Sequence, residues 1–198
     1  EATGFEGEWV FLDAGMAAIE KGKDPVPQET LEAIREIGVA LKGPTTTPSG
    51  GGHKSANVQL RQALDLFANV RPAKTLPGLT GPFASMQLDM IIVRENTEDL
   101  YAGIEYKPHP DVAQAIKVIT RQGCARLVKY GFMMAREQER KRVTAVHKAN
   151  IMKMTDGMFL EEFYKAAAEF PELKADDIIV DNCCMQLVTK PEQFDVLV

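Results

Sequence analysis

Residues 94–105 read Arg-Glu-Asn-Thr-Glu-Asp-Leu-Tyr-Ala-Gly-Ile-Glu, and they follow directly on the apolar run Met-Ile-Ile-Val of residues 90–93. A short apolar run of this kind is typical of a buried strand. Arg94 and Tyr101 therefore lie, seven residues apart, just past a predicted strand end. Ligands of open α/β sheets bind beyond the carboxyl ends of the strands, so this segment predicts both a fold class and a binding site.

The segments on either side alternate between two kinds of regular structure. Apolar or alternating runs predict further strands at residues 9–12, 39–42, 142–147, 177–180 and 194–198. Helical periodicity and Pro or Gly boundaries predict helices at residues 14–20, 27–36, 55–68, 122–139 and 151–169. Residues 69–72 are expected to be extended, because the residue before a proline avoids the helical region. Strands that alternate with helices indicate an α/β fold.

Composition and charge narrow the class of partner. The chain has 198 residues, 45% of them hydrophobic and 26% charged, which is an ordinary soluble balance. A formal charge of −5 disfavours nucleic acid and anionic membranes as partners, and no apolar run reaches the roughly 18 residues of a membrane span. Three cysteines, two of them adjacent, disfavour a disulfide framework and favour a reducing compartment, so we expect a cytoplasmic protein.

A glycine-rich loop precedes the helix predicted from residue 55. A phosphate-binding P-loop needs glycine directly before its Lys-Ser pair and again five residues earlier, but His53 and Pro48 occupy those places, so we reject it. The plain alternative is a flexible loop that enters a helix. Ser55 begins that helix, where a hydroxyl and free N–H groups suit an anion. Asn57 and Arg61 are four residues apart and share one face of the helix.

Arg61, Arg71 and Arg94 are predicted at a helix face, a pre-proline bend and a strand end. Each arginine alone is typical of a solvated surface charge. Together with Lys148 they would suit a di- or tricarboxylate, because a guanidinium binds a carboxylate through two parallel hydrogen bonds. Spacing along the sequence does not by itself show that these side chains converge.

Three further polar residues each admit two interpretations. Tyr101 is either a half-buried anchor or an acid. Lys148 follows a predicted strand and is either a surface charge or, if it loses its proton, a base. Asp181 ends a predicted strand and is either a helix N-cap or a ligand of Mg²⁺ or Mn²⁺. Cys183 and Cys184 have no second cysteine pair or histidine cluster at ligand spacing, so zinc is rejected.

Three separated blocks of the sequence match a known pattern in order. They are Lys42-Gly-Pro-Thr-Thr-Thr47-Pro through Ser55, Asn57 and Arg61 to Arg71-Pro72, then residues 94–105, then Val146-His-Lys148-Ala-Asn150 through Asp181. On these blocks the chain resembles the β-decarboxylating dehydrogenases, the isocitrate and isopropylmalate dehydrogenase family. The resemblance implies an isocitrate/isopropylmalate dehydrogenase-like fold, with residues 1–66 in a partial large domain and residues 67–198 in a small domain. It also implies a dimer-forming clasp around residues 100–120.

The resemblance further implies a reaction. Isopropylmalate enzymes of the family place apolar residues where this chain has Ser55 and Asn57, so the pair resembles the isocitrate branch and would hydrogen-bond the third carboxylate. We therefore expect oxidative decarboxylation of isocitrate to 2-oxoglutarate with NAD or NADP and Mg²⁺ or Mn²⁺. The alternatives are a homoisocitrate or isopropylmalate dehydrogenase, and a non-catalytic regulatory subunit that binds isocitrate.

Residue roles follow from the same resemblance. The residues expected to bind substrate carboxylates are Ser55, Asn57, Arg61, Arg71 and Arg94. Tyr101 would protonate the enolate left after CO₂ departs, Lys148 would assist removal of the hydroxyl proton, and Asp181 would bind the divalent metal. Thr47 and Asn150 would lie near the nicotinamide. Lys148 and Asp181 act in the partner subunit's site in this family, which implies a homodimer with shared active sites.

Two parts of the family pattern are missing from the sequence. The opening strand with its glycine-rich turn should precede Glu1, and two further metal-binding aspartates should follow Val198. We therefore expect a chain that is truncated at both ends and catalytically inert on its own.

Overall fold

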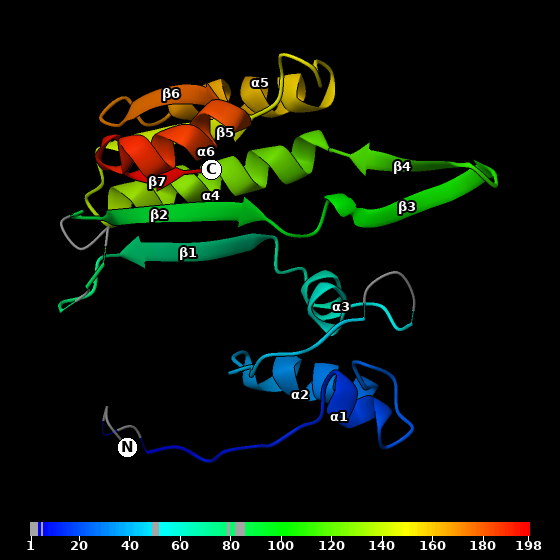
Figure 1. Ribbon diagram of the computed structural model, residues 1–198. Helices are drawn as coiled ribbons and strands as arrows, with labels where there is room; N and C mark the ends of the chain where they lie inside the picture. The colour runs from blue at the N-terminus through cyan, green and yellow to red at the C-terminus, as the bar shows by residue number, and fades with distance from the viewer. Residues whose placement is uncertain (1–3, 5, 49–51, 79, 82–85) are drawn as a thin grey trace. The chain divides into compact units, whose positions relative to one another are not determined.

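A computed structural model describes residues 4, 6–48, 52–78, 80–81 and 86–198 of the chain (Figure 1). The chain divides into two units, Glu1–Leu66 and Phe67–Val198. These are the bounds expected for the two domains, whose assignment as parts of a large and a small domain stays a prediction. Residues 50 and 51 of the rejected P-loop pattern lie outside the described residues. None of the helices in the described ranges is long and apolar enough to cross a membrane.

The first unit holds three helices, α1 (Met16–Ile19), α2 (Gln28–Ile37) and α3 (Ala56–Ala63). Pro27 stands at the N-cap of α2, and Gly38 closes that helix in the left-handed region at a φ of 79°. The small core of this unit is formed by Val26, Leu31, Ile34, Ala56, Leu60 and Leu64. The helix predicted at residues 27–36 is thus confirmed, together with both of its boundary residues.

Two strands predicted in this unit, residues 9–12 and 39–42, are wrong. Both segments are loops, and the described part of the unit contains no strand. A strand needs a hydrogen-bonded neighbour, and an apolar pattern alone does not supply one. Phe11 and Leu41 are accordingly 89% and 87% exposed.

The helix predicted at residues 55–68 also ends earlier than expected. It stops at Ala63, and Asp65 takes a left-handed φ of 48° that turns the chain out of the helix. Aspartate is one of the few residues besides glycine that visits this region. A strand begins at Ala68, where the prediction still placed helix.

The second unit is built on a five-stranded sheet in the order β1-β2-β7-β5-β6 (Figure 1). Its strands are β1 (Ala68–Lys74), β2 (Asp89–Glu95), β5 (Arg142–His147), β6 (Lys174–Ile179) and β7 (Val196–Leu197). β1 is antiparallel to β2, and the other neighbouring strands are parallel. A second sheet pairs β3 (Asp99–His109) with β4 (Val112–Val118) as a hairpin that extends away from the larger sheet (Figure 1).

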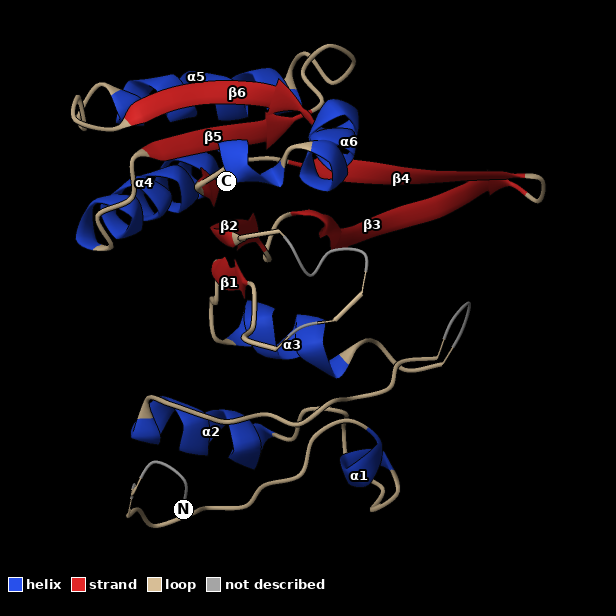
Figure 2. Cartoon of the chain, turned by 60° about the vertical axis from the view of Figure 1, so that its left-hand side comes forward, coloured by secondary structure: helices blue, strands red, loops and turns tan. Residues whose placement is uncertain are grey.

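Helices cover both faces of the five-stranded sheet. α4 (Arg121–Glu137) and α5 (Thr155–Ala167) lie on one face, and α6 (Val180–Thr189) lies on the other (Figure 2). Side chains alternate along β2, so that Ile91 packs in the core shared with α4 and α5 while Met90 packs with residues of α6. This three-layer arrangement confirms the predicted α/β class.

Three boundaries in the second unit differ from prediction, although residues 142–147 form the strand predicted for them. The strand predicted at 177–180 begins earlier, and its last residue already belongs to α6. The helix predicted from residue 151 begins at Thr155, because the residues before it form turns that close on the carbonyl of Lys148. The last strand is reduced to two residues and follows a short 3₁₀ helix, Pro191–Gln193.

Candidate functional site

Parallel pairing puts the carboxyl ends of β2, β7, β5 and β6 at one edge of the sheet, which we call the carboxyl edge. Lys148 directly follows β5, and Asp181 lies two residues beyond β6. The sequence predicts Arg94 beyond a strand end, but Arg94 is the next-to-last residue of β2, and Tyr101 lies in β3. Predicted site residues thus gather where ligands of α/β sheets bind.

Arg94 and Tyr101 form the first pair at this edge. Arg94 Nη2 donates a hydrogen bond to the Tyr101 hydroxyl oxygen, and the guanidinium carbon lies 5.2 Å from the centroid of the tyrosine ring. Arg94 is paired with Asn69 across β1 and β2, and Arg71 lies two residues after Asn69. Arg71 and Arg94 therefore share one face of the sheet, as diagonal neighbours within reach of long side chains.

Lys148 and Asp181 form the second pair. Lys148 Nζ donates to Asp181 Oδ2, which links the loop after β5 to the first turn of α6. Their side chains are 33% and 69% exposed, so solutes reach the Asp181 carboxylate. The N-cap interpretation of Asp181 is wrong, because Ile179 is the N-cap of α6. Asn150 lies in the exposed turn that follows Lys148.

The two pairs occupy different strands of the edge. Arg94 lies on β2 and Lys148 follows β5, with β7 between them. Because neighbouring strands are about 4.8 Å apart, the two backbones are separated by about 10 Å. The chain therefore presents an Arg–Tyr pair and a Lys–Asp pair as two distinct arrangements.

A cavity of about 420 Å³ opens at the carboxyl edge. Its lining is mostly apolar, but Arg94, Tyr101 and Lys117 bring polar groups to it, and so do the carboxylates of Glu95, Glu98, Asp99 and Asp156. The three cysteines also line it as free thiols, and burial raises the pKa of Cys124 to about 11. A largely apolar cavity with a few polar groups has the composition of a small-molecule site.

The remaining predicted substrate and cofactor residues lie in the first unit. Ser55 is the N-cap of α3, and its side chain makes no capping hydrogen bond. Asn57 and Arg61 lie one helical turn apart on the same face of α3, as predicted. The buried Asn57 Oδ1 has no hydrogen-bond partner among the described residues, so this side chain keeps an unused acceptor. Thr47 is exposed in the preceding loop.

Buried side chains outside the predicted site hold the loop that carries Lys148. The backbone N–H of Lys148 donates to Asp156 Oδ2 at 2.7 Å, and that of Ala149 donates to His147 Nδ1 at 2.9 Å. His147 Nε2 in turn lies 2.9 Å from Asp177 Oδ2. The signals that could have revealed these residues are the position of His147 at a strand end beside Lys148 and that of Asp156 at a helix start.

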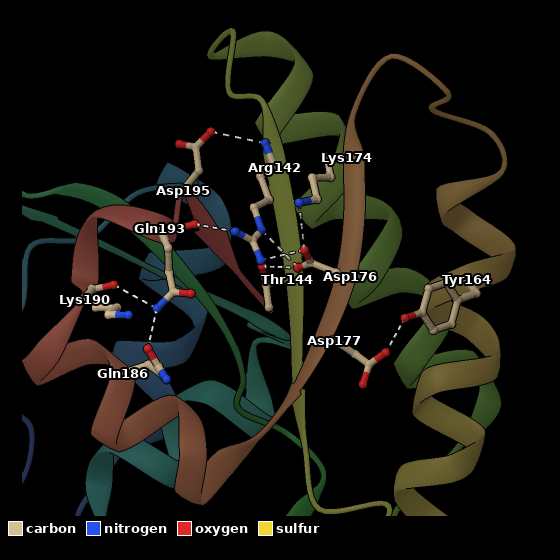
Figure 3. A network of polar contacts seen from close by, with 10 residues as sticks. All are labelled: Arg142, Thr144, Tyr164, Lys174, Asp176, Asp177, Gln186, Lys190, Gln193 and Asp195. Carbon is tan, nitrogen blue, oxygen red and sulfur yellow. Dashed lines mark hydrogen bonds and ion pairs between the residues drawn. The ribbon is translucent and has the colours of Figure 1, made fainter.

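Electrostatics keep the two carboxylates of this network charged. Burial raises the pKa of Asp156, but hydrogen bonds from Lys117 and from the Lys148 backbone lower it further than burial raises it. Tyr164 donates a hydrogen bond that lowers the pKa of Asp177, while burial and the same bond raise the pKa of Tyr164 to about 12. Figure 3 shows Tyr164 of α5 pointing at Asp177 of β6.

A divalent metal is implied by the role expected of Asp181. Within the described ranges, no group of three or more His, Cys, Asp or Glu side chains could hold a metal ion. Asp181 supplies one exposed carboxylate, which suits a single ligand of Mg²⁺ or Mn²⁺ but does not complete a site. A bound metal would therefore need additional ligands.

A model of the isocitrate/isopropylmalate dehydrogenase family matches residues 1–198. The chain belongs to this family. The match confirms the resemblance inferred from the three sequence blocks. A crystal structure of isocitrate dehydrogenase from Methylococcus capsulatus also matches all of the chain, with a TM-score of 0.94 and 50% sequence identity, and the chain covers 59% of that protein. The isocitrate/isopropylmalate dehydrogenase fold is therefore confirmed as well.

Curated relatives within the family carry different names. Regulatory subunit 1 of the mitochondrial NAD isocitrate dehydrogenase of Arabidopsis thaliana is 53% identical over 87% of this chain and 47% of its own length. The NADP isocitrate dehydrogenase of Thermus thermophilus is 46% identical over 94% of this chain and 38% of its own length. The chloroplastic 3-isopropylmalate dehydrogenase of Solanum tuberosum is 47% identical over 96% of this chain and 53% of its own length. The chain thus spans about half of these relatives or less.

Proposed function

We propose that the protein to which this chain belongs oxidises isocitrate and decarboxylates it to 2-oxoglutarate, with NAD or NADP as hydride acceptor. The observation that carries the proposal is the Arg94–Tyr101 pair at the cavity, because it unites a carboxylate-binding cation with a proton donor. Arg71, on the same sheet face, offers a second carboxylate ligand. One relative is named as an NADP isocitrate dehydrogenase and another as a catalytic subunit of an NAD isocitrate dehydrogenase, and these names support this substrate and both cofactors.

The side chains of this segment would handle the protons of the reaction. A guanidinium has donors only, so the Tyr101 oxygen accepts from Arg94 and the Tyr101 O–H points elsewhere. In the proposed reaction this O–H would deliver a proton to the carbon that loses CO₂. Lys148 Nζ donates to Asp181 in this structure; once that contact is broken, Lys148 would, as the neutral amine, accept the hydroxyl proton of the substrate. Asp181 would contribute one ligand to a divalent cation, which when bound acts as a Lewis acid on the substrate oxygens.

A homodimer with shared sites completes the proposal. The β3–β4 hairpin exposes the apolar side chains of Leu100, Ile104, Tyr106, Val112 and Ile116. A lone two-stranded hairpin is marginally stable in water, so a second copy that covered it would stabilise it. By the family resemblance, the Lys–Asp pair of one chain would act with the Arg–Tyr pair of its partner. Size-exclusion chromatography with light scattering should give the mass of two chains; a monomer contradicts this part.

Two alternative functions are each suggested by the name of a similar protein. The 3-isopropylmalate dehydrogenase is as similar as the isocitrate enzymes, but this chain has polar Ser55 and Asn57 where an isopropyl group needs apolar contacts. A regulatory subunit would bind isocitrate without turning it over. Both the Arg94–Tyr101 pair and the Lys148–Asp181 pair favour a catalytic chain over that alternative.

Substrate profiling tests the proposal in a full-length protein that contains this chain. Initial rates of NADH or NADPH formation are measured with isocitrate, homoisocitrate and 3-isopropylmalate. Isocitrate should be preferred over 3-isopropylmalate by about 10⁴-fold in kcat/KM, because an apolar analogue leaves polar groups of the site unpaired. A preference for either other substrate overturns the proposal. Isocitrate binding in a calorimeter without turnover would instead identify a regulatory subunit.

A further inference from the structure

The loop that carries Lys148 is fixed at its backbone. Lys148 N–H donates to Asp156 Oδ2 at 2.7 Å, and the Lys148 carbonyl accepts from Met152 N–H at 2.8 Å. The next N–H, that of Ala149, donates to His147 Nδ1 at 2.9 Å. Three successive backbone groups around Lys148 thus have defined partners, and two of those partners are side chains.

Both side-chain acceptors are buried, and His147 is held in one tautomer. His147 and Asp156 are 8% and 6% exposed. Because His147 Nδ1 accepts the Ala149 N–H, the ring proton resides on Nε2, from which it is donated to Asp177 Oδ2 at 2.9 Å. Asp177 also accepts from Tyr164. The tautomer that the loop needs is therefore the one that Asp177 selects.

Asp156 connects the same loop to the hairpin. Lys117 of β4 donates to Asp156 Oδ1 at 2.6 Å, and its side chain is 20% exposed. Lys117 also lies 3.6 Å from Asp99 Oδ2, at the start of β3. One carboxylate oxygen of Asp156 thus faces the hairpin while the other holds the Lys148 amide. A buried carboxylate left without its cation is costly, so the hairpin and the loop are coupled through this residue.

We propose that Asp156 and His147 are positioning residues that set the place of the Lys148 side-chain nitrogen, and that Lys117 ties this place to the β3–β4 hairpin. The proposal rests on the role proposed above for Lys148 in isocitrate oxidation. Asp156 and His147 hold two adjacent backbone amides and act through Lys148 rather than on the substrate. A displacement of about 1 Å at a reacting group costs about 100-fold in rate, so the backbone bonds bear directly on turnover.

Paired variants separate the individual bonds. His147→Asn keeps an acceptor near the place of Nδ1, whereas His147→Gln keeps a donor near the place of Nε2 and loses that acceptor. Asp156→Asn keeps one acceptor oxygen but loses the charge that Lys117 pairs with. Lys117→Met removes the Lys117 contacts with both Asp156 and Asp99 and keeps the two carboxylates. Lys129→Met is the matched control, since it breaks an exposed ion pair between Lys129 of α4 and Glu169, which follows α5.

The first readout is amide hydrogen exchange of the chain by NMR, which requires no turnover. The Ala149 amide should exchange about tenfold faster in His147→Gln than in the wild type, and within about twofold of wild type in His147→Asn. The Lys148 amide should exchange about tenfold faster in Asp156→Asn if the new side-chain NH₂ group faces the Lys148 N–H. In Lys117→Met the exchange rate of the Lys148 amide should rise less than it does in Asp156→Asn. Unchanged Ala149 exchange in His147→Gln overturns the proposal.

The second readout is kinetic, in a full-length protein that contains the chain. His147→Gln should lower kcat about 10- to 100-fold and change KM for isocitrate less than about threefold, with rescue by His147→Asn. Faster exchange at Ala149 with an unchanged kcat overturns the positioning role, as does an equal effect of Lys129→Met. If the wild-type protein does not turn over isocitrate, the proposed function fails by itself. The exchange data then still decide whether His147 and Asp156 hold the loop.

Discussion

The two edges of the five-stranded sheet carry the same kinds of charged residues but arrange them differently. At the amino edge, where the parallel strands begin, Arg140 donates to Asp89 at 2.6 Å and to Asp195 at 3.1 Å. Arg142 pairs with Asp176 at 2.6 Å within the same region (Figure 3). At the carboxyl edge, one pair is open to solvent and the other faces a cavity.

The two edges differ in the hydrogen-bond partners of their charged side chains. Asp195 also accepts the backbone N–H groups of Lys141 and Arg142, at 2.6 and 3.3 Å, so its partners all belong to the fold. The pairs at the carboxyl edge keep surface for a ligand. We therefore expect the amino edge to contribute to stability and the carboxyl edge to the proposed chemistry, the same division that α/β barrels show between their two ends.

The largest expected effect is on rate, at the carboxyl edge. Tyr101→Phe should lower kcat by about 10²- to 10⁴-fold, because it removes the proposed proton donor, while the free energy of unfolding changes by less than about 1 kcal/mol. Steady-state kinetics and urea unfolding of a full-length protein check both parts. Tyr130→Phe is the control, because Tyr130 of α4 is 37% exposed and its ring packs edge-on against Phe67. A Tyr101→Phe protein with near wild-type kcat would show that Tyr101 is not the proton donor.

A large effect on stability is expected at the amino edge. Asp195→Ala should lower the free energy of unfolding by about 2–4 kcal/mol, since Arg140 and two backbone N–H groups lose a charged acceptor. Asp181→Ala should cost less than about 1 kcal/mol, because its ion pair is exposed. Urea denaturation of this chain compares the two variants. If both variants lost the same free energy of unfolding, the two edges would not differ in their contribution to stability.

Acid should weaken the amino edge. Hydrogen bonds from Lys74 and Arg140 hold the pKa of Asp89 below its ordinary value of 3.8. A carboxylate with a lowered folded-state pKa stabilises the fold above its unfolded pKa, and that contribution is lost as the pH falls through the folded value. The urea midpoint should therefore begin to drop below about pH 4, and less steeply in Asp89→Asn. An identical pH profile for both proteins would show that this contact contributes nothing measurable.

The smallest effect is expected away from both edges. Lys129→Met removes an ion pair whose side chains are 55% and 52% exposed. Such pairs contribute about 0–1 kcal/mol, so the free energy of unfolding should stay within about 0.5 kcal/mol of wild type. A larger loss in urea denaturation would show that the exposed charges of Lys129 and Glu169 matter as much as those at the amino edge.

The sequence predicted those parts of the fold whose signal is local. The strand at residues 142–147 and the helix bounded by Pro27 and Gly38 follow from short patterns and boundary residues. The strands predicted at 9–12 and 39–42 failed because strand formation depends on a neighbour that no local pattern specifies.

In the candidate site, too, the sequence predicted the local features and missed those that depend on the fold. Sequence blocks located Arg94, Tyr101, Lys148 and Asp181, but not their pairing, which follows from strand order and register. The prediction also missed the hydrogen bond from Lys148 N–H to Asp156 Oδ2. It began the helix at residue 151, whereas α5 begins at Thr155 and the residues before it form turns. The roles of these residues remain predictions.

The position of β7 has a consequence for how the second unit is made. This strand, Val196–Leu197, comes last in the sheet along the chain, yet it lies at the centre between β2 and β5. As the polypeptide leaves the ribosome, the β1–β2 and β5–β6 halves emerge first, each with an open edge toward the missing strand. Unpaired strand edges recruit other strands, so β2 and β5 are exposed to misassociation until β7 has emerged.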